Sequence, residues 1–341
     1  MRALALLSLA GCNLFSKDPD ATGSDGSDGP EPSANCENEG WFETGVYAPV
    51  VELETLSQTQ VEVPGVGPMK LLSFVPENPV AVLWVFHGTG GDIGNLTQIE
   101  YVRIYNALLH DGFAIVATES EERGSQAQWS HEIGVDNSDF QRLILLRDHL
   151  IDTTPLEDAT PTFAMGFSNG SNFAGTFMDA GFEMGWDMRA ASLHSASPEP
   201  TVQAPTILLD AENDETIGET VMPNAYDDQL ATGFATDLFT HVEHALDPAE
   251  MQKIETLDAE ESQLAFDEGV RLGVIDETGA RAFDLPDLDD VLDVYENQAT
   301  VQWKAVIVSQ LRVVFATHRV NGERYREIRN RFVCEALGWG I

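Results

Sequence analysis

The feature that most constrains the fold is a series of short apolar runs separated by amphipathic stretches. Residues 81–88 (AVLWVFHG), 113–120 (FAIVATES) and 160–168 (TPTFAMGFS) are apolar segments that end in turn residues. A strand shows such a run when both its faces are buried, as in a parallel sheet. Residues 139–151 (DFQRLILLRDHLI) instead repeat apolar residues at helical spacing. We therefore expect an α/β architecture, a mainly parallel sheet with helices on both faces.

The remaining segments complete this sheet and interrupt it once. Residues 51–63 and 70–76 predict an antiparallel edge hairpin, and further strands are predicted at 190–196, 205–211 and 311–318. Residues of about 219–300 are acidic and are interpreted as several helices. We expect them to form a lid-like helical insertion before the last strand, either a wall over the active site or a peripheral decoration.

A candidate nucleophile lies where the run at 160–168 ends. Gly166-Phe167-Ser168-Asn169-Gly170 matches the pattern G-x-S-x-G between a buried strand and a helix-compatible segment. In this context the pattern forms a sharp turn, in which flanking glycines relieve crowding. Ser168 would then present its hydroxyl at the N-terminus of a helix, where a developing negative charge is stabilised.

A glycine-rich loop provides candidates for the oxyanion hole. His87-Gly88-Thr89-Gly90-Gly91 directly follows the strand at 81–86. Acyl transfer requires two N–H donors that point at the developing oxyanion. The residue after the nucleophile, Asn169, is predicted to supply one, and Thr89 the other, with Gly90 as the next choice. His87 is interpreted as a structural turn residue and not as the catalytic base.

A carboxylate in a loop after a strand can hold a catalytic imidazole in the correct tautomer. Asp214 follows the strand at 205–211 and is our candidate, with Asp210 and Glu212 as competitors.

Among the eight histidines, His318 is placed at the end of the predicted strand 311–318 and before a terminal helix. His241 and His244, in the insertion, are the alternative bases. His194 would line the pocket or be a buried structural histidine. The chain order Ser168, Asp214, His318 is that of α/β-hydrolases.

Four segments give the chain a resemblance to a known group of α/β-hydrolases: FHGTGGD, GVDNSDFQRLI, PTFAMGFSNGSNFA and LLDAENDETI. Over about residues 66–341 the chain resembles the polyhydroxybutyrate depolymerases and feruloyl esterases related to carbohydrate esterase family one. Asp136 and Phe140 match a segment that precedes the nucleophile in this group. Members often have Gly before the catalytic His, whereas this chain reads Ala316-Thr317-His318.

The resemblance implies a serine hydrolase that cleaves carboxylic esters through an acyl-enzyme and needs no metal or organic cofactor. The implied substrates are hydroxycinnamoyl or acetyl esters on polysaccharide, or polyhydroxyalkanoate oligomers. Two alternatives stay open: a serine peptidase or amidase with the same triad, and a non-catalytic surface lipoprotein that binds ligands.

The N-terminus predicts export. A short positive and apolar segment ends in Leu9-Ala10-Gly11-Cys12, which resembles a bacterial lipobox and would make Cys12 the lipidated residue. Residues 13–40 are rich in Asp, Gly, Ser and Pro and predict a flexible acidic tether to the catalytic domain at 41–341. Asn13 after the cysteine favours an outer-membrane lipoprotein, on the periplasmic side or at the cell surface.

Cysteine usage and charge limit the partners. With Cys12 acylated, Cys36 and Cys334 form an even pair, which suggests a disulfide; two free thiols are the alternative. Their spacing offers no zinc motif. Eighteen Lys and Arg against 57 Asp and Glu give a formal net charge of −39, which repels nucleic acid and anionic lipid. We expect a monomer that contacts the membrane only through its lipid anchor.

Overall fold

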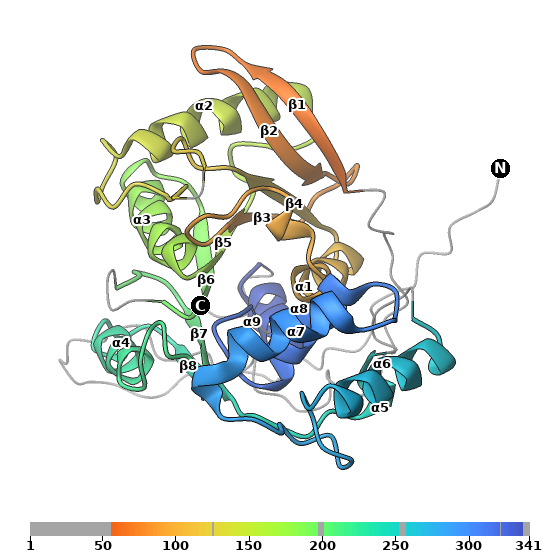
Figure 1. Ribbon diagram of the computed structural model, residues 1–341. Helices are drawn as coiled ribbons and strands as arrows, with labels where there is room; N and C mark the ends of the chain where they lie inside the picture. Colours follow the sequence, from red (N-terminus) through yellow and green to blue (C-terminus); the bar gives the residue numbers. More distant parts are fainter. Residues whose placement is uncertain (1–55, 125, 197–200, 252–256, 321, 337–341) are drawn as a thin grey trace, which may run out of the picture. The chain divides into compact units, whose positions relative to one another are not determined.

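The computed structural model describes residues 56–124, 126–196, 201–251, 257–320 and 322–336. Its centre is an eight-stranded sheet of order β1-β2-β4-β3-β5-β6-β7-β8 (Figure 1). The strands are β1 (Ser57–Val63), β2 (Gly67–Phe74), β3 (Ala81–Phe86), β4 (Phe113–Thr118), β5 (Thr162–Phe167), β6 (Met188–His194), β7 (Thr206–Ala211) and β8 (Thr236–His241). The edge hairpin β1–β2 is antiparallel, and β2 pairs antiparallel with β4. All remaining pairings are parallel and join β4, β3, β5, β6, β7 and β8 in that order.

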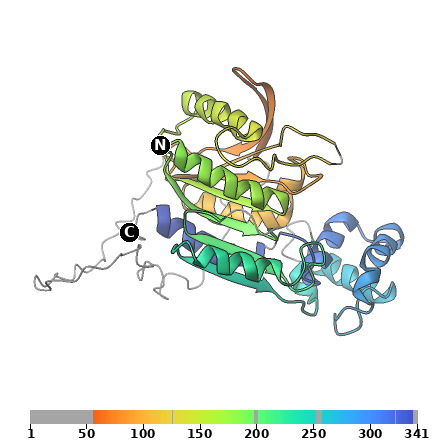
Figure 2. The same ribbon diagram turned by 90° about the vertical axis from the view of Figure 1, so that its left-hand side faces the viewer.

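Helices cover both faces of the sheet (Figure 2). They are α1 (Ile99–His110), α2 (Ser138–Thr153), α3 (Asn169–Glu183), α4 (Val221–Leu230) and α9 (Tyr325–Ala336). Successive residues of a strand point to opposite faces. In β3, Trp84 and Phe86 pack in a cluster with residues of α2 and α3, whereas Leu83 and Val85 pack in a second cluster with residues of α1 and α9. A strand buried on both faces therefore reads as the continuous apolar run seen in the sequence.

This strand order, with a reversed β2, six crossover-connected parallel strands and helices on both faces, is an α/β-hydrolase fold. The predicted fold class is confirmed. The carboxyl ends of β3, β5, β6 and β7 lead into loops along one edge of the sheet, and these loops carry the predicted site residues Thr89, Ser168 and Asp214.

The place of the helical insertion differs from the prediction. Residues 311–318 do not form the last strand, because Lys304–Val314 is helix α8; its residues Ile307, Leu311 and Val314 are buried at helical spacing. The last strand is β8, inside the segment interpreted as helical. β8 is an edge strand with mostly half-buried side chains, so its sequence lacks a strong period-two pattern.

The insertion therefore follows the last strand and does not precede it. It comprises α5 (Pro248–Met251), α6 (Ala259–Arg271), η4 (Leu285–Asp287), α7 (Leu288–Gln298) and α8, which together we call the cap (Figure 1). The cap has its own buried cluster, which includes Val274, Leu292, Tyr295, Leu311 and Phe315. Because α8 belongs to that cluster, the cap fixes the start of the segment that carries His318.

The predictions for the signal segment 1–12, the tether 13–40, Cys12 and Cys36 lie outside the described residues. Cys334 is buried on α9. Within the described ranges, none of the helices combines the length and the apolar character that a membrane crossing requires.

Candidate active site

Ser168 occupies a strained turn between β5 and α3. Its backbone has φ 53° and ψ −122°, a conformation that residues with a Cβ rarely adopt. A Cβ on Gly166 would lie 2.1 Å from the Gly170 carbonyl oxygen, and one on Gly170 would lie 2.3 Å from the Phe86 carbonyl oxygen. Only glycine fits at both positions, which is the spatial requirement of a nucleophile elbow.

Hydrogen bonds hold this turn against β6. The Ser168 N–H donates to the His194 carbonyl oxygen at 2.8 Å. The Ser171 hydroxyl lies 2.6 Å from the Gly166 carbonyl oxygen and also contacts the backbone of His194. Ser168 itself is half-buried at the N-terminus of α3. The helix end therefore places its positive partial charge beside the serine.

His318 and Asp214, which are far apart in the sequence, meet at the carboxyl edge of the sheet. His318 Nδ1 lies 2.7 Å from Asp214 Oδ2. Asp214 Oδ1 accepts the backbone N–H groups of Thr216 and Ile217, each at 3.1 Å. The Asp214 side chain is 2% exposed and that of His318 is 19% exposed. The arrangement leaves the imidazole partly accessible while its carboxylate partner is enclosed.

The environment of Asp214 favours its charged form. Burial acts to raise the pKa of this carboxyl, but the hydrogen bond and charge of His318 act against it, together with hydrogen bonds from Ser195 and Ile217. The net result is a pKa below the ordinary value of an aspartate. Asp214 is therefore ionised at neutral pH and holds the proton of His318 on Nδ1, so that Nε2 is left as the basic nitrogen.

The competing residues have other contacts. Glu212 accepts the backbone N–H of Glu243 with its carboxylate. His241 lies with Nε2 2.7 Å from the Val313 carbonyl oxygen and so contacts the end of α8. The pKa of Asp210, at the end of β7, is raised by burial and by the nearby Asp214 charge. Of the three acidic candidates, Asp214 is the one that contacts His318.

A second contact brings His318 to the nucleophile turn. The His318 ring packs against Phe167, the residue before Ser168, with ring centroids 4.6 Å apart. Asn213 secures the loop from the other side, because its N–H donates to the Ala316 carbonyl oxygen and its Nδ2 to the Phe315 carbonyl oxygen, both at 2.9 Å. The loops after β7 and α8 thus form one hydrogen-bonded unit beside the elbow.

The helix end before His318 is a Schellman motif. The Thr317 N–H donates to the Arg312 carbonyl oxygen, and the Ala316 N–H to that of Val313. Ala316 has φ 50°, in the left-handed region that this motif requires and that glycine usually fills. A residue with a Cβ therefore occupies a strained backbone position two residues before His318.

The predicted oxyanion donors lie on two adjacent segments. A Cβ on Gly88 would lie 2.9 Å from the Phe167 ring, so the 87–91 loop packs directly on the elbow. Within the described part of the chain, the N–H groups of Thr89 and Asn169 donate to no acceptor. The Gly90 N–H donates to the Ala127 carbonyl oxygen at 2.6 Å, so it is already used. Thr89 and Asn169 remain the available pair.

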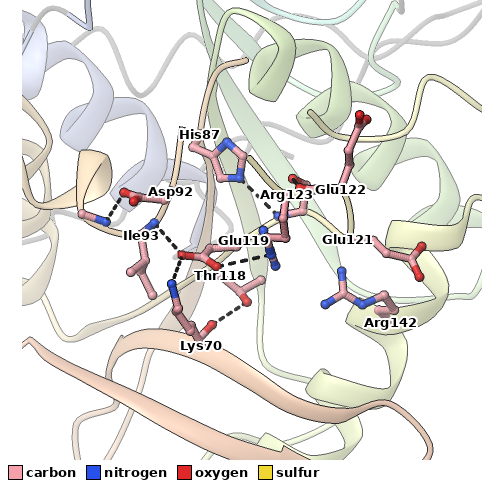
Figure 3. Close-up of polar contacts among 12 residues, drawn as sticks. Lys70, His87, Asp92, Ile93, Thr118, Glu119, Glu121, Glu122, Arg123 and Arg142 are labelled. Atoms are coloured by element: carbon pink, nitrogen blue, oxygen red, sulfur yellow. Dashed lines mark hydrogen bonds and ion pairs between the residues drawn. The ribbon is translucent and has the colours of Figure 1, made fainter. Parts of the chain in front are cut away.

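His87 is a buried structural residue of this loop (Figure 3). Its Nε2 accepts the Ser120 N–H at 3.2 Å, so the ring proton lies on Nδ1, which donates to the Gly88 carbonyl oxygen at 2.8 Å. Burial lowers the pKa of His87, which keeps the ring neutral. In a trans peptide the carbonyl and the following N–H point in opposite directions. The bond to Gly88 therefore sets the direction of the Thr89 N–H.

Three further residues of the site lie in no recognisable sequence motif and were not predicted from the sequence. Asn213 links the acid and base loops. Ser195, with φ 46°, hydrogen-bonds Asp214 from the end of β6. Trp129 contacts both oxyanion segments. Their roles depend on contacts between loops distant in sequence, and no local pattern signals such contacts.

No group of three or more His, Cys, Asp or Glu side chains in the described ranges could hold a metal ion.

No protein-family model matches the chain, and no curated protein sequence matches it. Among solved structures, a thermostable esterase aligns at 15% identity and a TM-score of 0.42, covering 56% of each chain. A Bacillus cereus carboxylesterase aligns at 15% identity and a TM-score of 0.38, covering 57% of this chain and 93% of its own. A thermostable esterase from Pseudomonas putida aligns at 12% identity and a TM-score of 0.42, covering 61% and 80%.

Proposed function

We propose that the protein is a serine hydrolase that cleaves carboxylic esters through an acyl-enzyme intermediate. The observation that carries this proposal is the 2.7 Å contact between His318 and Asp214 beside the strained turn of Ser168. Nucleophile, base and orienting acid are recognised by such roles and geometry and not by their place in a sequence.

In the first step, His318 Nε2 takes the proton of Ser168 as the serine oxygen attacks the ester carbonyl carbon. Asp214 holds the ring in position and stabilises the imidazolium. The N–H groups of Thr89 and Asn169 bind the oxyanion of the tetrahedral intermediate. His318 then gives its proton to the departing alcohol, which leaves the acyl group on Ser168. Water, activated by His318, releases the acid in the second step.

The resemblance supports a narrower substrate class. The segments at 86–92 and 161–174 resemble those of feruloyl esterases and polyhydroxybutyrate depolymerases. We therefore propose hydroxycinnamoyl or acetyl esters on polysaccharide, or polyhydroxyalkanoate oligomers, as the natural substrates. A series of p-nitrophenyl esters from acetate to octanoate, compared with methyl ferulate, would rank these classes.

Replacing Ser168 with Ala tests the reaction itself. The Ser168→Ala variant is expected to lose hydrolysis by at least about a thousandfold, because no nucleophile remains. It should also lose covalent labelling by a serine-directed phosphonate. Ser138→Ala, at an exposed serine that starts α2, is the matched control and should keep both. Continued labelling of the Ser168→Ala protein would contradict the assignment.

We also propose that the protein is exported and anchored by a lipid on Cys12, with Cys36 and Cys334 joined in a disulfide. The lipobox-like LAGC segment, the acidic tether and the even cysteine pair support this. Non-reducing peptide mapping of the protein isolated from membranes is the test. A diacylated peptide beginning at Cys12 and a linked Cys36–Cys334 peptide are expected, whereas an unmodified N-terminus or free thiols would contradict the proposal.

A further inference from the structure

Trp129 lies in the segment after β4 and contacts the residue that follows the nucleophile. Its backbone N–H donates to Asn169 Oδ1 at 2.7 Å, and Asn169 Nδ2 lies 3.4 Å from the Trp129 carbonyl oxygen. Asn169 is 7% exposed and begins α3. Its side chain is therefore paired with both polar groups of one backbone residue, while its own N–H stays available as an oxyanion donor.

The indole of Trp129 contacts the other oxyanion segment. Its Nε1–H donates to the His87 carbonyl oxygen at 3.0 Å. The ring stacks on Phe173 of α3, with centroids 4.5 Å apart and planes at 15°, and meets Phe86 of β3 edge-on at 5.1 Å. The side chain is 1% exposed. A single rigid residue thus contacts the end of β3 and the start of α3, the two elements that carry the donors.

Neighbours of Trp129 attach the same segment to the oxyanion loop. The Ala127 carbonyl oxygen accepts the Gly90 N–H, and the Ser120 N–H donates to His87. Buried Glu119 accepts the Ile93 N–H at 3.2 Å and pairs with Lys70 (Figure 3). These bonds attach the segment after β4 to the 87–93 loop, and Trp129 extends the attachment to Asn169 and Phe173 of α3.

We propose that Trp129 is a positioning residue that fixes the Thr89 and Asn169 N–H groups relative to each other. This inference rests on the proposed function, in which those groups form the oxyanion hole. Donors stabilise a transition state only when held within about 0.5 Å of the productive geometry. The two donors belong to separate elements, so a shared, buried contact is the means by which this chain keeps their spacing constant.

The test breaks the contacts of Trp129 one set at a time, first the bond to His87 and then the bonds to Asn169. Trp129→Phe keeps an aromatic ring on Phe173 and the backbone bonds to Asn169, but it loses the bond to His87. Asn169→Ala keeps the donor N–H and loses both bonds to Trp129, together with the 3.5 Å contact between Asn169 Nδ2 and His131 Nε2. For each variant we expect kcat to fall about tenfold with KM changed by less than about twofold, since loosening a donor costs less than removing it.

Binding of a trifluoromethyl ketone, which forms a tetrahedral adduct with the serine, is the second readout. Its affinity should fall by the same factor as kcat/KM, because the adduct uses the oxyanion donors. The double variant should lose less than the product of the two single losses, since both break one bridge. Trp186→Phe is the matched control: Trp186 packs on Phe140 and Phe177 in the same core cluster and should keep wild-type kinetics.

A lower melting temperature with unchanged kcat and inhibitor affinity in Trp129→Phe and Asn169→Ala would overturn the proposal, because the role would then be packing alone. Strictly multiplicative losses in the double variant would overturn it too. If the wild-type protein hydrolyses no ester and Ser168 is not labelled, the proposed function itself fails. If the wild type is active and both variants keep wild-type kinetics, only the positioning role of Trp129 is refuted, and the proposed function stands.

Discussion

At the scale of single residues, backbone strain gathers at the active site. Among the described residues, four with a Cβ have positive φ, namely Ser168, Ser195, Trp303 and Ala316. Ser168 is the proposed nucleophile, Ser195 hydrogen-bonds Asp214, and Ala316 lies two residues before His318. Such conformations persist only where the surrounding structure fixes them, and they concentrate at functional sites. The strain is therefore an independent mark of the site that geometry and sequence identify.

The backbone strain at Ala316 can be tested by substitution. A left-handed conformation costs a residue with a Cβ about 1–2 kcal/mol, and a β-branched side chain more. Ala316→Gly relieves this cost but loses a buried methyl, so its unfolding free energy should stay within about 1 kcal/mol of wild type. Ala316→Val should lose about 2 kcal/mol or more and lower kcat, because His318 shifts with the turn. Denaturant unfolding and ester kinetics of both variants are the measurements; equal stability of the Val and Gly variants would refute the strain.

At the scale of elements, the site is a meeting of loops at one edge of the sheet. The elbow follows β5, the acid loop follows β7, and the oxyanion loop follows β3. The base is different, because it follows α8 and not a strand. Asn213 joins acid and base loops and also donates to Glu243 at 2.7 Å, and Glu243 in turn pairs with Arg281. Through this chain of contacts the segment leading into α7 is connected to the loop that holds the Asp214 carboxylate.

The sequence predicted the elements whose burial leaves a clear pattern. The apolar runs at 81–88, 113–120 and 160–168 became β3, β4 and β5, because a strand covered on both faces must be apolar throughout. The pattern failed at β8 and α8. In the predicted strand 311–318 the β-branched residues Val313 and Val314 are typical of a strand, but contacts within the cap favour helix α8.

The predictability of the site follows the same division. Ser168, Asp214 and His318 could be predicted as a triad because their residue types and chain order fit the chemistry, and the fold brings the last two within 2.7 Å. Asn213, Ser195 and Trp129 could not be found, because an asparagine, a serine or a tryptophan has no distinctive role until its partner is known. Their partners Phe315, Asp214 and Asn169 lie in other loops.

At the scale of the whole molecule, we predict that stability at acid pH depends on one buried histidine, His194, at the end of β6. Burial lowers the pKa of His194 from 6.5 to about 3. The Nε2 atom lies 3.1 Å from the Ser192 hydroxyl, and the same residue's backbone oxygen anchors Ser168. Between the two pKa values the unfolded chain binds a proton that the folded chain excludes. The part of the free energy of unfolding that is linked to His194 is therefore fully retained above the pKa of this histidine in the unfolded chain, 6.5, and is lost as the pH falls below that value.

The size of this effect separates it from the titration of the 57 acidic residues. Because the unfolded chain binds this one extra proton, the free energy of unfolding falls by about 1.4 kcal/mol per pH unit below about pH 6. His194→Gln places an uncharged amide near the Ser192 hydroxyl and removes this proton uptake, while the carboxylates of the chain stay the same. Urea unfolding of both proteins from pH 7 to 4 should show a smaller loss of stability in the variant, by about one proton's slope. Parallel curves would mean that His194 does not cause the loss of stability between pH 7 and 4. The Asp214 carboxyl does not cause it either, because its pKa is lowered and its contribution is lost only when the pH falls through that value, below this range.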